Sequence, residues 1–323
     1  MRSFILDGYS VAGALLLFRS DPCCHSVPMR QRIEEWKSIY DTDDNAITKA
    51  LSKLAWDLAA FTCIVEMVRQ APDEGEGKRL NGMVLEMLVT GFWNNMMQGV
   101  RRLAEPGPIR GPRAVCSLGG LLQDARAARP GITRRVFVED IAGLDYDFEA
   151  IEERYWAYVL AQREPGYMNI PRALDSEPSR QRHVLFDQLS GVLPENRTPD
   201  DLIKPEVFDG LHQRLARLDG VVHHVHVQIA HAGTEFSRTG RQLQQWNLTD
   251  ARDSLKELAQ IAQLAGDWFC YSGVGSILPH PQFDQFAHIN QAFYTGDPAP
   301  LQAIWDNLER EMGHWHDVDL QAL

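Results

Sequence analysis

Apolar residues recur along much of the chain at alternating steps of four and three, the period of an α-helix that is buried along one side. The pattern runs from Ile47 to Val68, again from Leu85 to Leu103, and a third time from Phe208 to Ala232. Runs of this length each predict a helix of six or more turns. No alternation of apolar and polar residues is long enough to indicate a sheet. We therefore predict an all-α fold in which these helices form an antiparallel helical bundle.

The centres of the three runs are expected to be nearly inaccessible to solvent. Gly99 interrupts the second run, and because glycine weakens a helix by about 1 kcal/mol, we expect a close helix crossing there. The core positions that represent the three seams are Leu54, Leu58, Phe92, Met96, Leu215, Leu218 and Val222.

Proline and glycine mark the boundaries of the bundle. Three prolines and two glycines between residues 105 and 113 end the second helix. Residues 105–204 hold only short helical patterns between further prolines, which indicates an irregular helical insertion packed on the bundle. We predict a poorly defined N-terminal extension over 1–28 and a single helical domain over 29–323. Its core spans about 45–104 and 205–278, and shorter helices follow at 281–293 and 298–313.

The net charge of −12 disfavours a general binder of nucleic acid or of anionic membranes, because such partners are repelled at long range. One stretch departs from this average. Between Arg101 and Arg135 there are eight arginines against two acidic residues, a net charge of +6. Either these arginines form a local anion site, or they pair with the acidic excess elsewhere. If RNA or a nucleotide binds, the candidate residues are Arg101, Arg102, Arg110 and Arg113.

Five scattered cysteines form neither a disulfide framework nor a zinc motif. The apolar run from Val11 to Phe18 is far shorter than the roughly 20 residues that a membrane-spanning helix needs, and no cleavage site follows it. We therefore expect a cytoplasmic protein with no membrane segment.

Four of the eleven histidines lie between His223 and His231, within the third helical run. None of them falls on the apolar seam, so we expect their imidazoles to point away from the core. Imidazoles titrate near neutral pH and serve in proton transfer, ligand binding and subunit interfaces. The alternative is that they are ordinary solvated side chains.

Several short motifs occur in an order that resembles a known superfamily. The second long helix carries Phe92-Trp93 and ends in Arg101-Arg102-Leu103-Ala104; Ser117-Leu118-Gly119-Gly120-Leu121-Leu122 follows, and the third run closes on Gln228-Ile229-Ala230-His231-Ala232. This order is similar to the HEPN superfamily (higher eukaryotes and prokaryotes nucleotide-binding), in particular its abortive-infection-related branch. The resemblance implies an all-α bundle, usually dimeric, which in active members cleaves RNA without a metal through an Arg-x4–6-His motif at the dimer interface.

The motif carries over only in part. Its histidine matches His231, but the three positions open to its arginine hold His224, Val225 and His226. Arg217 and His223 fit the spacing formally, two turns earlier. Arginine is always charged and stabilises a phosphate as charge develops, whereas an ordinary histidine is mostly neutral at pH 7.5. If cleavage occurs, His231 is expected to act as the acid or base, with His224 or His226 as the second proton-transfer group.

The resulting hypothesis is an RNA- or nucleotide-directed protein of a defence or stress system, catalytically degenerate or a metal-independent endoribonuclease. A first alternative is a non-catalytic interaction protein; with either, we predict a homodimer that uses the histidine helix. A second alternative is a metal site on His224 and His231, or on His223 and His226, completed by His314, His316 or Asp317. These histidines lie off the predicted seam and no Glu-x-x-His pair accompanies them, so we predict no metal and no cofactor.

Overall fold

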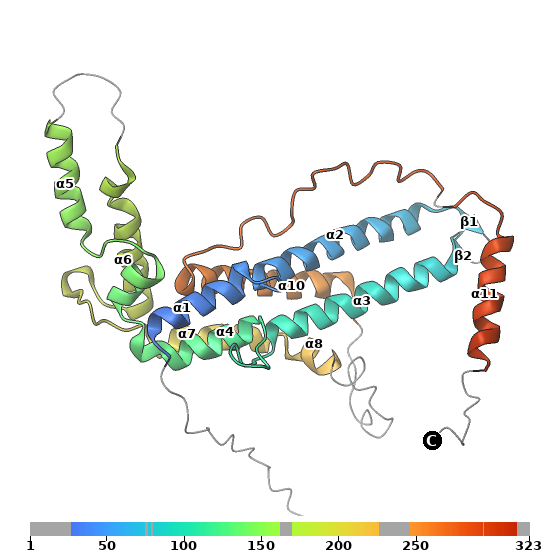
Figure 1. Ribbon diagram of the computed structural model, residues 1–323, viewed down its shortest axis with the longest axis horizontal. Coiled ribbons are helices and arrows are strands. Elements are labelled where there is room, and N and C mark those ends of the chain that lie inside the picture. The colour runs from blue at the N-terminus through green and yellow to red at the C-terminus, as the bar shows by residue number, and fades with distance from the viewer. Residues whose placement is uncertain are drawn as a thin grey trace, which may run out of the picture. The chain divides into compact units, whose positions relative to one another are not determined.

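The computed structural model describes residues 27–74, 77–78, 80–161, 170–225, 246–292 and 294–314. The chain divides into two units, one ending at Pro279 and the other beginning at His280. The prediction of one domain over 29–323 differs from this division at its C-terminal end. The larger unit is built on three long helices that lie side by side (Figure 1), namely α2 (Ile47–Gln70), α3 (Gly82–Ala104) and α10 (Leu248–Phe269).

The all-α prediction is confirmed, and α2 and α3 span the first two predicted runs. Within the described residues, the strands are β1 (Asp73–Glu74) and β2 (Gly77–Lys78), two residues each, which pair antiparallel between α2 and α3. The other helices of the larger unit are α1 (Met29–Lys37), η1 (Ser38–Thr42), α4 (Leu118–Ala128), η2 (Arg129–Gly131), η3 (Val136–Ile141), α5 (Phe148–Ala161), η4 (Arg172–Leu174), α6 (Glu177–Ser190), η5 (Pro194–Asn196), α7 (Pro205–Ala216) and α8 (Asp219–His224).

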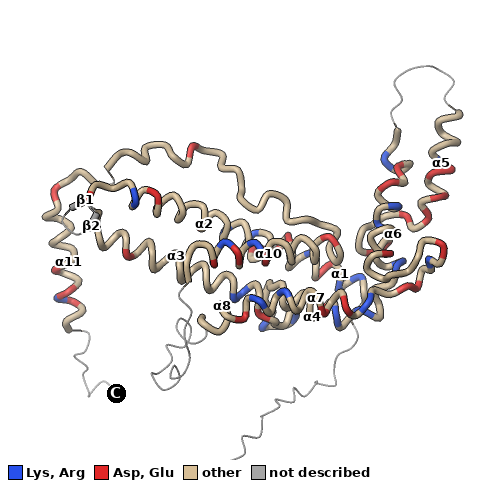
Figure 2. The backbone as a smooth tube through the Cα atoms, turned by 180° about the vertical axis from the view of Figure 1, so that it is seen from behind, with Lys and Arg blue, Asp and Glu red and all other residues tan. Residues whose placement is uncertain are grey.

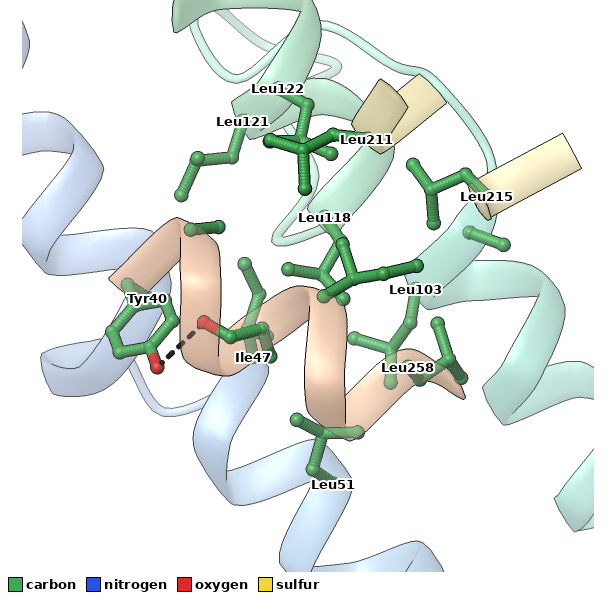
Figure 3. Packing of buried hydrophobic residues seen from close by; sticks show 14 of the residues in the cluster. Tyr40, Ile47, Leu51, Leu103, Leu118, Leu121, Leu122, Leu211, Leu215 and Leu258 are labelled. Carbon is green, nitrogen blue, oxygen red and sulfur yellow. Dashed lines mark hydrogen bonds between the residues drawn. The ribbon is translucent and has the colours of Figure 1, made fainter. Parts of the chain in front are cut away.

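The three long helices pack through apolar side chains. The expected close crossing at Gly99 is present, because a Cβ atom there would lie 3.0 Å from Leu54 Cδ1. Phe61 of α2 stacks on Phe92 of α3, with ring centroids 4.0 Å apart. At the other end of the bundle, the buried Tyr40 hydroxyl donates to the carbonyl oxygen of Ala262 in α10, at 3.1 Å (Figure 3). Burial raises the pKa of this hydroxyl far above its usual range, so it stays a donor.

α4 belongs to the core and is not peripheral. Leu118, Leu121 and Leu122 are fully buried and face side chains of α7 and α10 (Figure 3). The prediction that residues 105–204 form an insertion outside the core is therefore wrong for α4. The helix has only eleven residues, too few for its apolar period to identify it as a core helix. The described parts of α5 and α6 do project from the bundle (Figure 1).

The start of α4 approaches the end of α3 through two glycines. Ser117 caps the helix, its hydroxyl accepting from the backbone N–H of Gly120 at 3.0 Å. A Cβ atom at Gly119 would lie 2.7 Å from the backbone nitrogen of Pro106, and one at Gly120 would also meet backbone. The Ser-Leu-Gly-Gly motif thus places the chain that follows α3 directly against α4.

The third predicted run is broken in the structure, between α7 and α8. Asp219 and Gly220 favour a helix little, and the N–H of Leu218 donates to the carbonyl of Leu215, three residues back, at 2.9 Å. This tighter turn changes the register, so that Val221 and Val225 are buried and Val222 is only partly covered.

The seven predicted core positions divide accordingly. The expectation of near-complete burial is wrong for Val222, because of this break, and for Leu58, which borders an open groove beside α10. It is confirmed for Leu54, Phe92, Met96, Leu215 and Leu218.

Two buried arginines and a histidine hold α6 to its neighbours. Arg134, with none of its side chain exposed, pairs with Asp187 and Asp201, each at 2.8 Å. The Arg182 guanidinium lies 3.6 Å from the centroid of Phe137. His183 contacts the carbonyl oxygen of Tyr146 through Nε2 at 2.8 Å, while its buried Nδ1 has no hydrogen-bond partner among the described residues.

The smaller unit contains the predicted C-terminal helix, α11 (Ala299–Met312). Its apolar stripe, formed by Leu301, Ile304, Trp305 and Leu308, is exposed. The helix expected at 281–293 is wrong, since the described residues there form turns.

Substitution of Gly119 tests the close approach of α4. We expect Gly119→Ala to lower the free energy of unfolding by about 1–3 kcal/mol, because the methyl group meets backbone atoms that cannot move aside. Gly91→Ala is the matched control: no atom lies within 4 Å of its Cβ, so helix propensity should stabilise the protein by up to about 1 kcal/mol. Urea unfolding of both variants measures the difference, and equal stabilities would contradict the packing.

The pH dependence of stability should include a contribution from His183. Burial lowers the pKa of this imidazole, and the charges of Arg134 and Arg197 lower it further, although the Tyr146 carbonyl opposes them. A folded-state pKa below the unfolded value, about 6.5, means that the stabilisation is complete above that pH and is lost below it. We expect His183→Gln to flatten the fall in unfolding free energy between pH 7 and 5 by at most about 1.4 kcal/mol per pH unit. His280→Gln, at an exposed position, is the matched control.

Candidate anion-binding site

Most arginines between 101 and 135 are engaged in ion pairs, as one of the two interpretations of this stretch expected. Five pair with carboxylates, and Arg129 donates to the backbone carbonyl of Ile203 at 2.6 Å. The five are Arg101 with Glu105, Arg110 with Glu35 and Asp124, Arg126 with Asp209, Arg134 with Asp187 and Asp201, and Arg135 with Glu139. In Figure 2 basic and acidic positions lie close together around α4 and α7, whereas the half of α3 next to β2 has few of either.

Arg110 is held in a compact ionic cluster. Its two terminal nitrogens donate to the carboxylate of Asp124 at 2.5 and 3.0 Å, and its Nε pairs with Glu35. Trp36 and Arg32 also donate to Asp124, at 2.7 and 2.9 Å. Burial acts to raise the pKa of Asp124, but these hydrogen bonds and charges outweigh it and leave the pKa below its usual value. Arg110 therefore has few donors left for a ligand.

Arg102 and Arg113 remain, and neither has an ion pair among the residues that the structure describes. Both are exposed. Arg102 comes from the last turn of α3, where a cation is favoured by the helix dipole, and its side chain lines two neighbouring clefts. Val115, from the chain that returns towards α4, borders both clefts as well.

The first cleft, of about 540 Å³, is lined by donors from one face of α3. Asn95, Gln98 and Arg102 follow one another at steps of three and four, with Arg101 beside them. The one acidic residue in its lining is Glu105, which accepts from Arg101 Nε at 2.9 Å. Main chain at 106–108 forms the opposite wall. The amide nitrogen of Asn95 already donates to Asp57 of α2. The remaining set can hold a phosphate by charge while the amide of Gln98 contacts a base.

The second cleft, of about 500 Å³, is less suited to an anion. Glu35 and Asp43 both line it, together with Asn45 and Cys116. Burial and the neighbouring Asp43 raise the pKa of the Cys116 thiol to about 11, against the opposing charge of Arg102. The thiol is therefore neutral at physiological pH and is a poor nucleophile.

The histidine cluster is only partly described. His226 and His231, two of the three catalytic candidates, lie outside the described residues. His223 is exposed, as expected. His224 is not: its Nδ1 is buried, and its ring stands edge-on to Trp246 with centroids 6.4 Å apart. The expectation that all four imidazoles point away from the core is wrong for His224, because the break before α8 turns this residue inwards.

The burial of His224 has a chemical consequence. Desolvation lowers the pKa of its imidazole, and the adjacent His223 lowers it further, so His224 is neutral at pH 7. It cannot supply the fixed positive charge of the missing motif arginine. Arg217, the formal alternative, pairs with Glu257 at 3.4 Å.

The described part of the chain shows neither a metal site nor a membrane-spanning helix. No group of three His, Cys, Asp or Glu residues there could hold a metal ion. His316 and Asp317, two of the suggested ligands, lie outside it. None of its helices is long and apolar enough to cross a membrane.

Comparisons with family models, with curated proteins and with solved structures find no match to this chain.

Sequence reasoning named Arg102 but missed Asn95 and Gln98. The signal was present, because these residues share a face of the predicted second helix with Arg102, beside its apolar seam. It could not be interpreted without the chain at 105–116, which converts an exposed helix face into a cleft.

Proposed function

We propose that the protein binds single-stranded RNA or a nucleotide, with a phosphate at Arg102, as a HEPN-like protein of a defence or stress system. The observation that carries the proposal is the position of Arg102, a fixed cation with no ion pair among the described residues, in a cleft that also presents the amide of Gln98. An arginine pairs with a phosphate through parallel hydrogen bonds, which a flexible, hydrated surface lysine does less well.

The same protein is proposed to cleave RNA slowly or not at all. General acid–base help from a histidine is worth roughly 10²–10⁴-fold, and a preorganised charged stabiliser can add about 10²–10³-fold. His231 can supply the first contribution. The neutral imidazole of His224 does not supply the second.

A second candidate function is that of a non-catalytic, homodimeric interaction protein. It is favoured by the half of α3 next to β2, where Met83, Val84, Met87 and Leu88 are exposed on one side of the helix. A contiguous set of large exposed apolar side chains is typical of an interaction surface, and methionine adapts readily to a partner.

Substitution of Arg102 tests phosphate binding. We expect Arg102→Ala to weaken binding of a fluorescent ten-nucleotide uridylate RNA about tenfold at 50 mM salt. The slope of the logarithm of the binding constant against the logarithm of the salt concentration should fall by about one, because one phosphate contact is lost. Arg126→Ala is the matched control, since it removes the same charge from an exposed pair with Asp209. Fluorescence anisotropy measures both. Binding that is absent at low salt favours the interaction protein, and equal losses in the two variants would show that only net charge matters.

Cleavage is tested with the same RNA in the presence of a chelator. We expect little or no product over hours, because the motif arginine is missing and His224 is neutral. The RNA products of the protein and of the His231→Ala variant are compared on a denaturing gel. Rapid metal-independent cleavage that this substitution abolishes would overturn the proposal of a degenerate site.

A further inference from the structure

A second surface of the bundle has a different chemistry, an apolar groove beside α10. It has a volume of about 440 Å³. Its floor is formed by Leu255 and Ala259, one wall by Leu58 of α2, and the other by Val274 and Ile277 from the chain that follows α10. The side chains of the walls are only half-buried, so the groove is open to solvent.

The second wall is held in place by specific contacts. The backbone N–H of Val274 donates to Gln263 Oε1 of α10 at 3.1 Å, and that of Ser272 donates to the carbonyl oxygen of Gly266, also at 3.1 Å. Gly266 has no room for a Cβ atom against Tyr40 and Ser272. The chain at 271–277 is thus fixed along α10, which makes the groove a built feature of the larger unit.

The polar residues that line the groove are basic residues and glutamines, and none of the lining residues is acidic. Arg252, Lys256, Gln260 and Gln263 follow one another along α10 at steps of four, four and three. Arg252 and Lys256 are exposed, and neither has an ion pair in the described part of the chain. The neighbouring Glu257 lies on another side of the helix, where it pairs with Arg214 at 2.7 Å.

We propose that this groove binds an amphipathic helix of a protein partner, with the apolar face of that helix in the groove and its acidic residues against Arg252 and Lys256. Charge complementarity carries the proposal: two adjacent cations, which have no carboxylate partner among the described residues, border an apolar surface in a chain of net charge −12. Residues four apart on a helix are neighbours, so glutamates at the same spacing on a facing helix can meet both. An apolar groove that runs along a helix can bind the apolar face of an amphipathic helix.

The test uses two synthetic 16-residue helices that differ only in charge. Both carry leucine at i, i+3, i+4 and i+7 positions; one has glutamate pairs four residues apart beside the leucines, and the other has lysine at the same places. We expect the full-length protein to bind the fluorescein-labelled glutamate peptide at least tenfold more tightly than the lysine peptide, as measured by anisotropy. Equal affinities would overturn the proposal.

Charge reversal in the protein locates the site. Arg252→Glu/Lys256→Glu should weaken binding of the glutamate peptide at least tenfold and strengthen binding of the lysine peptide, with the circular dichroism spectrum unchanged. Arg102→Glu/Arg113→Glu is the matched control, since it changes the net charge equally at two exposed arginines elsewhere on the protein. This control should keep peptide binding while losing RNA binding, so the two proposed sites fail or succeed separately.

A long-chain carboxylate is the competing ligand. Laurate is tested below its micelle concentration. If laurate displaces the peptide, and if its binding requires Arg252 and Lys256, the ligand of the groove is a fatty acid and the proposal of a partner helix is wrong. An unchanged affinity of the glutamate peptide for Arg252→Glu/Lys256→Glu would overturn the proposed site altogether.

Discussion

The carboxylate of Asp124 organises the region on which the candidate site depends. It lies in α4 and accepts hydrogen bonds from Trp36 and Arg32 of α1 and from Arg110, in the chain between α3 and α4. A partly buried carboxylate is stable only when such donors replace water, and removal of one partner leaves an uncompensated charge. This cluster therefore fixes the returning chain at 105–116 against α1, and that chain gives both clefts their outer walls.

The same region shows what a local pattern can and cannot predict. The seams of α2 and α3 follow from their four-three period, because each helix buries one continuous stripe. The break before α8 does not, since the apolar period continues through Leu218 and only the weak helix formers Asp219 and Gly220 hint at it. α4 was also missed as a core helix: its seam of Leu118, Leu121 and Ala125 is short, and its burial depends on α7, far along the chain.

The tertiary structure likewise determines which arginines are available to a ligand. Arg102 and Arg110 were equal candidates in the sequence, yet Arg110 meets Glu35, 75 residues away, while Arg102 meets no carboxylate among the described residues. Sequence supplies the number of charges, and the fold decides which of them are neutralised. The histidine cluster shows the same dependence, because a change of register in one turn separates a solvated His223 from a half-buried, neutral His224.

The two proposed binding surfaces differ in the force that would hold a ligand. At Arg102 the attraction is electrostatic and short-ranged, because at physiological ionic strength a charge is screened within about 8 Å and the net charge of −12 does not favour approach. Affinity there would come from direct contact with Arg102 and from the Gln98 amide beside it, and it should fall steeply with salt. In the groove beside α10, apolar contact would supply the affinity, and Arg252 and Lys256 would favour an acidic partner over a basic one. An acidic protein can therefore carry an anion site and a docking groove without being a general binder of polyanions.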